Sequence, residues 1–338
     1  MSKSVNISIT GAAGRIGYAL VFRLANGDLF NGTIGSADSG IPSHENVTVN
    51  LKLLEVPSAM KTLRGIQMEL DDCNFPSLGD VVITDDPEVA FGDADYVFMM
   101  GSKPRLRGME RSDLLHDNAK IFASHGRALG KVASKNVKVL IAGNPSNTNT
   151  LVALSNTVGL NSTNFSGMMQ LDVNRAKSIV SKYCGAPHTT INDIIIWGNH
   201  STTLYPDLNH AQVKGFPAMD LIDNDWYIKD YIPSVQNRGH SVIEWLGVSS
   251  AASAANAAIH QMKIWSGKGG SQLWESMAVL SSGQYGIESD LIFSFPIYHA
   301  RGKLFVVDDL DIDEYSESMI RLTEAELISE RDEIRHLL

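Results

Sequence analysis

Three residues in the middle of the chain have the chemical types needed to move a proton and to hold an organic acid. The segment L-D-V-N-R-A carries Asp172 and Arg175, and the later segment I-W-G-N-H-S carries His200. A carboxylate can orient a histidine, a histidine can transfer a proton, and an arginine can bind a carboxylate through two hydrogen bonds. Each piece alone has an ordinary explanation, because Asp-x-x-Arg is also a common ion pair on a helix face. Their meaning depends on the rest of the chain.

A glycine-rich segment near the N-terminus has the spacing of a dinucleotide-binding turn. The sequence I-S-I-T-G-A-A-G-R-I-G follows a predicted strand and opens a predicted helix. Gly11 would permit the tight turn, Gly14 would let the backbone approach a pyrophosphate, and Gly17 would allow close helix packing. The predicted cofactor turn comprises Gly11, Ala12, Ala13, Gly14, Arg15, Ile16 and Gly17.

An acidic residue after the second predicted strand indicates which dinucleotide is bound. Glu55 would hydrogen-bond the adenosine ribose diol and repel a 2′-phosphate, which favours NAD. It lies further along than the usual spacing of about 20 residues, because a Gly/Ser/Asn-rich stretch at 26–46, predicted to be a surface loop, intervenes. A solvated loop carboxylate is the alternative interpretation of Glu55.

The same glycine spacing occurs in short-chain and extended dehydrogenases and epimerases. Those enzymes need a Tyr-x-x-x-Lys pair for proton transfer, and none of the nine tyrosines has a lysine four residues later. The chain therefore lacks the catalytic pair that a short-chain or extended dehydrogenase would need.

Cations gather after the fourth predicted strand, at the edge of the sheet where ligands bind in such folds. Lys103, Arg105, Arg107 and Arg111 fall in one short segment of a chain whose formal net charge is −10. Lys103 and Arg107 could simply be solvated. Arg105 and Arg111 are predicted to bind a dicarboxylate, because a guanidinium forms paired bonds that lysine cannot mimic. Asn144, in G-N-P-S-N after the fifth strand, offers an amide to a substrate oxygen or is a turn-forming Asn-Pro.

The elements that position these residues alternate between strands and helices in the first half. Strands are predicted at 5–10, 47–56, 81–84, 96–100 and 137–142. This pattern is typical of an α/β, Rossmann-type, doubly wound parallel sheet. After about residue 149 the rhythm changes, and we expect a helix at 174–183, a strand at 191–198, an Ala-rich helix within 249–262 and an amphipathic terminal helix. We predict an NAD-binding domain over 1–156 and an α+β catalytic, substrate-binding domain over 157–338.

The composition narrows the function classes. An acidic chain does not suit nucleic acid or an anionic membrane surface as the main partner. Cys73 and Cys184 have no metal-type spacing and are too few for a disulfide framework, so no metal site is predicted. The N-terminus has no leader pattern and no apolar run could span a bilayer. We expect a soluble cytoplasmic protein.

Five motifs in order resemble malate dehydrogenases of the cytosolic type, within the lactate/malate dehydrogenase family. They span almost the whole chain and are T-G-A-A-G-R-I-G, P-R-x-x-G-M-E-R, G-N-P-x-N-T-N, L-D-x-N-R-A and W-G-N-H-S. The resemblance implies NAD as cofactor, malate or oxaloacetate as substrate, a place in the tricarboxylic acid cycle and a homodimer.

The resemblance also implies roles for individual residues. His200 would be the proton acceptor, with its imidazole held by Asp172. Substrate would be bound by Arg105, Arg111, Asn144 and Arg175. The cofactor side would include Asn118, His125, Ala142, Gly143 and Asn144.

Three features depart from the family pattern. Gln170 and Val173 replace a basic residue and a histidine, and neither replaced residue is required by the chemistry. His125 stands where a cofactor-side glutamine is usual, and the stretch at 26–46 exceeds the family norm. Two other functions remain open: a dehydrogenase of another 2-hydroxy acid such as lactate, against which Arg105 argues, and a non-catalytic NAD-binding relative.

Overall fold

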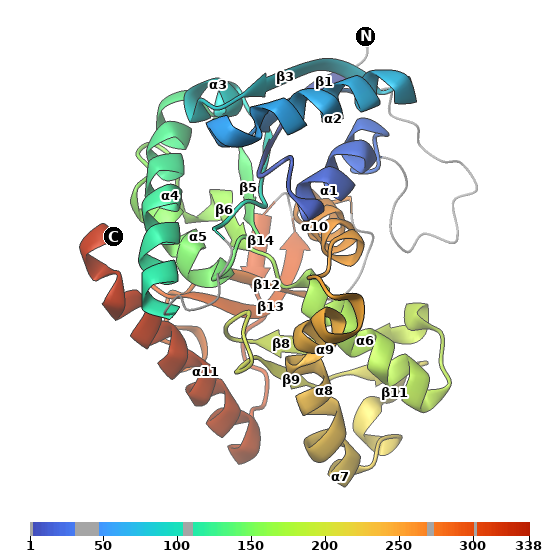
Figure 1. The fold of residues 1–338 in the computed structure, drawn as a ribbon. Helices are drawn as coiled ribbons and strands as arrows, with labels where there is room; N and C mark the ends of the chain where they lie inside the picture. Colours follow the sequence, from blue (N-terminus) through green and yellow to red (C-terminus); the bar gives the residue numbers. More distant parts are fainter. Residues whose placement is uncertain (1–2, 31–46, 104–110, 269–273, 301–302) are drawn as a thin grey trace.

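A nine-stranded sheet forms the centre of the protein. We describe it from a computed structural model, in which residues 3–30, 47–103, 111–268, 274–300 and 303–338 are described (Figure 1). In spatial order the strands are β14, β13, β12, β6, β5, β4, β1, β2 and β3. Their bounds are β1 Lys3–Thr10, β2 Val47–Leu54, β3 Leu78–Thr84, β4 Tyr96–Met99, β5 Lys138–Ile141, β6 Phe165–Gly167, β12 Glu275–Leu280, β13 Ile292–Ala300 and β14 Lys303–Val306.

The six strands from β6 to β3 run parallel, and β12 to β14 extend the same sheet in antiparallel fashion. Strand β1 lies inside the parallel part, and Ile7 and Ile9 are fully buried because helices cover both faces of the sheet. The predicted Rossmann-type parallel sheet is confirmed, as is the prediction that a second part with both helices and strands, expected as α+β, follows it.

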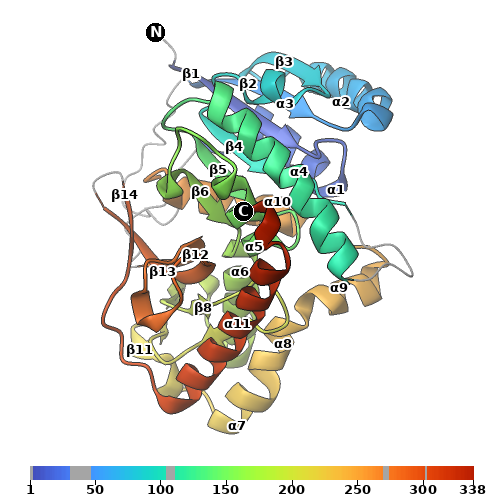
Figure 2. The ribbon, with the colours of Figure 1, turned by 90° about the vertical axis from the view of Figure 1, so that its left-hand side faces the viewer.

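Helices connect the strands and flank the sheet. Their bounds are α1 Arg15–Ala25, α2 Met60–Cys73, α3 Pro87–Phe91, α4 Arg111–Val132, α5 Ser146–Ser155, α6 Gln170–Cys184, α7 Asn224–Trp226, α8 Ile232–Gln236, α9 Arg238–Leu246, α10 Ala252–Trp265 and α11 Glu314–Glu333. Helix α1 packs on α10, whereas α4 packs on α5, on the other side of the sheet (Figure 1). The long C-terminal helix α11 runs beside α5 and β13 (Figure 2).

Several predicted elements differ from the structure in their bounds or continuity. The strand expected at 191–198 is broken into β7 (Ile191–Asn192) and β8 (Ile195–Trp197), because Asp193 adopts a left-handed conformation with φ 59°. Helix α6 begins four residues earlier than expected, which places Asp172 in its first turn. Strand β2 ends at Leu54, and β3 starts at Leu78.

The stretch at 26–46 is not a surface loop throughout. Leu29 and Phe30, which follow α1 in sequence, are buried in the main hydrophobic core. The surface-loop prediction is therefore wrong for this first part of the stretch. Residues 31–46 lie outside the described part of the chain. The remaining small strands pair away from the main sheet: β9 Tyr205–Asp207 with β8, and β10 Gln212–Val213 with β7 and with β11 Phe216–Pro217. Within the described ranges, no helix is both long and apolar enough to cross a membrane.

Candidate active site

The turn between β1 and α1 is packed as tightly as backbone allows. Gly11 has φ 66°, and a Cβ added to it would lie 2.5 Å from the Cα of Gly101. A Cβ on Gly17 would lie 2.2 Å from the carbonyl oxygen of Gly11, so only glycine lets α1 approach the turn. At Gly14 an added Cβ would approach only the Gly11 oxygen, at 3.1 Å. The start of α1 therefore presents bare backbone to the space in front of it.

That space is a groove of about 920 Å³. Of the residues predicted to bind the cofactor, its walls include Gly11, Gly14, Arg15, Ile16, Gly17, Glu55 and His125. Ala12 is buried beneath the turn. A helix N-terminus with exposed backbone amides suits the pyrophosphate of a dinucleotide, so the groove fits the cofactor that the sequence predicts.

Glu55 lies directly after β2 and is attached to the glycine turn. One of its carboxylate oxygens accepts a hydrogen bond from the backbone N–H of Ala13 at 3.0 Å. The other accepts one from the N–H of Val56 at 3.1 Å. The carboxylate is thus fixed at the wall of the groove, which disfavours the alternative of a freely solvated loop residue.

A second cavity of about 380 Å³ adjoins the groove. Ile16, Met100, Ser102 and Ser249 line both, so the two are one continuous site. The walls of this pocket include residues predicted for chemistry and for substrate or cofactor contact: Asp172, Arg175, His200, Ala142, Gly143 and Asn144. Sequence segments far apart in the chain therefore meet at one place.

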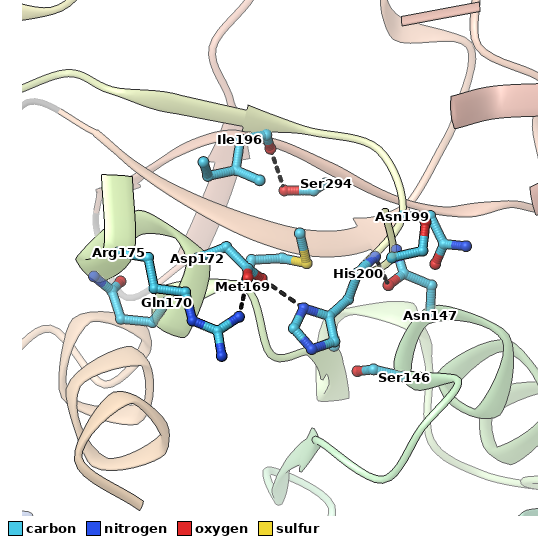
Figure 3. Close-up of polar contacts among 12 residues, drawn as sticks. Ser146, Asn147, Met169, Gln170, Asp172, Arg175, Ile196, Asn199, His200 and Ser294 are labelled. Atoms are coloured by element: carbon cyan, nitrogen blue, oxygen red, sulfur yellow. Dashed lines mark hydrogen bonds and ion pairs between the residues drawn. The ribbon is translucent and has the colours of Figure 1, made fainter. Parts of the chain in front are cut away.

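Asp172 is the centre of a hydrogen-bonded cluster with His200 and Arg175 (Figure 3). Its carboxylate accepts a hydrogen bond from Nδ1 of His200 at 2.5 Å and one from the guanidinium of Arg175 at 3.1 Å. The Asp172 side chain is completely buried, while those of His200 and Arg175 keep 16% and 14% of their surface. Because Nδ1 is occupied by the carboxylate, Nε2 is the ring nitrogen available to a substrate.

The charge state of Asp172 follows from its neighbours. Burial alone would raise the pKa of this carboxyl, but the His200 imidazole and the Arg175 guanidinium outweigh burial and hold the pKa below its usual range. Asp172 is therefore ionised at neutral pH, and an ionised carboxylate stabilises a protonated imidazole beside it.

Local structure explains how the cluster is assembled. Asp172 and Arg175 lie three residues apart in α6, so they share one face of the helix. His200 follows β8 on a turn whose Gly198 has φ 89°. Asn147, fully buried in α5, accepts a hydrogen bond from the His200 backbone N–H at 3.1 Å and donates one to the Gly198 carbonyl at 3.1 Å.

The segment predicted to bind the distal part of the substrate is only partly described. Arg105 and Arg107 lie outside the described residues, and Arg111 begins α4 with no described side chain. The Nζ of Lys103 forms an exposed ion pair with Asp117 at 2.6 Å, in keeping with a solvated role.

Asn118, on helix α4, is completely buried. Its amide oxygen accepts from the backbone N–H of Lys103 at 2.7 Å, and its amide nitrogen donates to the carbonyl of Asn144 at 3.2 Å. It joins the start of the basic segment to the turn at Asn144. Direct contact with the cofactor stays a prediction.

His125 faces the groove from α4 between two aromatic rings. It packs edge-on against Phe91 and Phe122, at centroid distances of 5.6 and 6.0 Å. Burial lowers its pKa to about 4, so the ring is neutral at pH 7. Its Nδ1 has no hydrogen-bond partner among the residues described. A neutral imidazole suits the apolar wall of the cofactor groove, so its position is compatible with the predicted place of His125 on the cofactor side.

Sequence reasoning missed several residues that build the pocket. Asn147 was available from the G-N-P-S-N motif, in which only Asn144 was singled out. Gln236, His240 and Ser249 line the pocket from α8, α9 and the turn before α10. Nothing in N-R-G-H or its surroundings marked His240, because its place in the pocket depends on how α9 lies relative to pocket residues that are distant in sequence.

A dinucleotide groove that opens onto a histidine–aspartate pair and an arginine defines an oxidoreductase that uses a nicotinamide cofactor. Comparison with known proteins agrees. Residues 5–166 match the lactate/malate dehydrogenase NAD binding domain, and residues 169–338 match the lactate/malate dehydrogenase α/β C-terminal domain. The chain therefore belongs to the lactate/malate dehydrogenase family, and NAD is its cofactor.

The similar solved structures include malate dehydrogenases and lactate dehydrogenases. A malate dehydrogenase from Naegleria fowleri is 41% identical, with a TM-score of 0.91 and coverage of 100% of both chains. A lactate dehydrogenase from Trichomonas vaginalis, in complex with NADH and oxamate, is 35% identical, with a TM-score of 0.89 and coverage of 98% of this chain and 99% of that one.

Proposed function

We propose that the protein is an NAD-dependent malate dehydrogenase, which catalyses reversible hydride transfer between malate or oxaloacetate and NAD(H). The observation that carries the proposal is the Asp172-linked pair of His200 and Arg175 in a pocket continuous with the cofactor groove. The cofactor, held by the glycine turn and by Glu55, supplies the hydride acceptor or donor.

The residues of the pocket do the rest of the chemistry. In malate oxidation, Nε2 of His200 takes the proton of the C2 hydroxyl while Asp172 stabilises the imidazolium through Nδ1. In oxaloacetate reduction the protonated ring returns that proton to the carbonyl oxygen. Arg175 binds the C1 carboxylate, and Asn144 hydrogen-bonds the substrate oxygen.

Arg105 and Arg111 complete the proposed site. Arg105 would bind the distal carboxylate, and Arg111 would polarise the carbonyl as charge develops on its oxygen. A lactate dehydrogenase is the second candidate, because one of the similar structures carries that activity in its name. Lactate and pyruvate have a methyl group in place of the distal carboxylate, which would leave Arg105 without its partner.

The test is NADH oxidation with purified protein against oxaloacetate, pyruvate and other 2-oxo acids. An unpaired buried charge costs roughly 3–5 kcal/mol, so oxaloacetate should be preferred by roughly 10²- to 10⁴-fold in kcat/KM. Arg105→Gln should collapse this preference, with Arg107→Gln as the control from the same segment. A wild-type preference for pyruvate, or an unchanged ratio in Arg105→Gln, would contradict the malate assignment.

Four further proposals accompany this function. We propose that the enzyme is a homodimer, that it works in the cytoplasm, that it serves the tricarboxylic acid cycle, and that its two domains comprise 1–156 and 157–338. Sedimentation, cell fractionation, metabolite labelling and limited proteolysis test them in turn.

A further inference from the structure

We propose that Glu326 and Glu330, on the C-terminal helix α11, are positioning residues that hold His200 in its reactive place. The inference rests on the proposed function only in that His200 is taken to move the proton. Whether the substrate is malate or lactate does not affect it.

Glu326 binds both neighbours of His200 in sequence. One of its carboxylate oxygens accepts hydrogen bonds from the side-chain amide of Asn199 at 3.0 Å, from the Thr203 hydroxyl at 2.6 Å and from the Ser201 hydroxyl. Ser201 lines the substrate pocket together with His200. A single carboxylate thus fixes the turn on either side of the histidine.

Glu330, one helical turn further along α11, adds a second attachment. It is only 6% exposed, and its carboxylate accepts from the Thr148 hydroxyl at 2.5 Å and from the Asn199 amide at 3.4 Å. Thr148 follows Asn147, whose side chain receives the His200 backbone N–H. The two glutamates therefore join α11 both to the turn that carries His200 and to the helix that supports this turn.

Gly198, two residues before His200, allows close contact between this turn and helix α11. A Cβ on Gly198 would lie 2.0 Å from the side chain of Thr323, which is also on α11. The Thr323 hydroxyl accepts from the backbone N–H of Asn199 at 2.9 Å, and its oxygen lies 3.0 Å from the Thr203 hydroxyl oxygen. The bare backbone of Gly198 lets the helix approach the turn directly.

Simple anchoring of α11 does not account for these contacts. The helix already buries Ile320 and Leu327 in the main core. Glu330 is buried and Glu326 is half-buried. Removing a carboxylate from water costs free energy, and each of these two is satisfied by donors from the His200 turn or from α5. A displacement of about 1 Å at a reacting group can lower the rate by about 10²-fold, so an anchor that sets the position of His200 has a direct catalytic consequence.

Charged and titratable groups surround His200 from several elements. Helix α6 contributes Asp172 and Arg175, and α11 contributes the two glutamates. Helix α9 contributes His240, which lines the same pocket. Because several charges act together, the test relies on a proton-transfer readout rather than on a pH profile alone.

The experiment compares Glu326→Ala, Glu326→Gln and Glu314→Ala in the full-length protein. Glu314 is an exposed glutamate on the first turn of the same helix and serves as the matched control. For each variant, kcat is measured per NADH-binding site, with KM for the best 2-oxo acid and the solvent deuterium isotope effect on kcat.

We expect Glu326→Ala to lower kcat per site by roughly 10- to 100-fold with little change in NADH affinity. The solvent isotope effect should rise, because a displaced His200 makes proton transfer slower than the other steps. Glu326→Gln should recover most of the loss, since its amide oxygen can accept where the carboxylate oxygen did. Glu314→Ala should behave as wild type.

Two results would overturn the proposal. One is a wild-type kcat per site in Glu326→Ala; the other is a loss of kcat with an unchanged isotope effect and no recovery in Glu326→Gln. If Glu326→Ala does not fold, Thr203→Val removes one donor at constant shape and should lower kcat by roughly 2- to 10-fold with the same rise in isotope effect. His200→Ala in parallel separates this proposal from the proposed function, because full activity there would remove His200 from the chemistry altogether.

Discussion

The cofactor groove and the catalytic pocket are adjacent but are built in different ways. The phosphate end of the groove is made of seven consecutive residues, and its chemistry comes from backbone amides that glycine leaves uncovered. The pocket is made of side chains from α6, from the turn after β8 and from the α8–α10 region, which are distant in sequence. A local motif therefore governs cofactor binding, whereas catalysis depends on how distant elements pack. Changes in the two regions should separate binding from turnover.

The largest expected effect belongs to Arg175 in the pocket. Arg175→Gln removes the guanidinium that we propose to bind the C1 carboxylate, and it leaves buried Asp172 with one ionic partner fewer. Breaking a buried pair costs roughly 3–5 kcal/mol, so kcat/KM should fall by roughly 10²- to 10⁴-fold for oxaloacetate and for pyruvate alike. NADH binding should be nearly unchanged.

Steady-state kinetics measure kcat/KM for oxaloacetate and pyruvate, and fluorescence titration measures the Kd of NADH. Lys182→Gln, an exposed change on the same helix, is the control. A selective loss of one substrate would give Arg175 a different role, and a loss of NADH binding would show that pocket and groove are not separable.

In the groove, Gly17→Ala should weaken NADH binding, whereas Arg175→Gln should lower turnover. The new methyl group would lie 2.2 Å from the Gly11 oxygen, so the turn must shift. Overpacking of this kind costs roughly 1–3 kcal/mol, and we expect the Kd of NADH to rise about tenfold or more.

Gly65→Ala is the matched control, because a Cβ there would meet nothing within 4 Å on helix α2. It should leave NADH binding intact and stabilise the helix by roughly 0.5–1 kcal/mol. Calorimetric titration compares the two variants. Equal NADH affinities would refute the view that Gly17 sets the shape of the turn.

A smaller change is expected from Glu55, which we propose to select NADH over NADPH. Glu55→Ser should narrow the preference for NADH over NADPH by about tenfold, because like-charge repulsion of the 2′-phosphate disappears. Glu55→Gln keeps an oxygen acceptor for the Ala13 N–H while removing the charge, so it isolates the electrostatic part. The ratio of kcat/KM for the two cofactors is the readout, and a wild type that prefers NADPH would end this assignment.

The smallest effect is expected at Asp193, a buried carboxylate whose pKa is shifted in the opposite direction to that of Asp172. The pKa of Asp172 is lowered by its partners, whereas burial raises the pKa of Asp193 from 3.8 to about 6. A raised pKa means that the folded state favours the protonated acid, so ionisation of Asp193 lowers stability as the pH rises through about 4 to 6.

Asp193→Asn should therefore raise the free energy of unfolding at pH 8 by roughly 1–3 kcal/mol, and the gain should vanish below about pH 4. Asparagine tolerates the left-handed backbone of this position, so no strain is added. Urea unfolding at pH 4 and pH 8 checks the sign. Turnover should not change; a gain of equal size at both pH values would assign the effect to packing instead.

Sequence predicted the parts of the molecule that rest on local rules. The glycine turn and the place of Glu55 at the end of β2 follow from spacing. The shared helix face of Asp172 and Arg175 was not predicted, because the expected helix began only at residue 174. The break at Asp193 was missed because I-N-D-I-I-I has the composition of one strand. His240 and the α11 glutamates could not be predicted, because their roles arise only where distant segments cross.

The most direct test of the account is His200→Ala, measured for both turnover and NADH binding. Removing a positioned acid–base group should lower kcat by roughly 10²- to 10⁴-fold, while the Kd of NADH stays within about twofold of wild type because the groove is built by other residues. Near-normal turnover in this variant would mean that another residue moves the proton, and the central claim would be wrong.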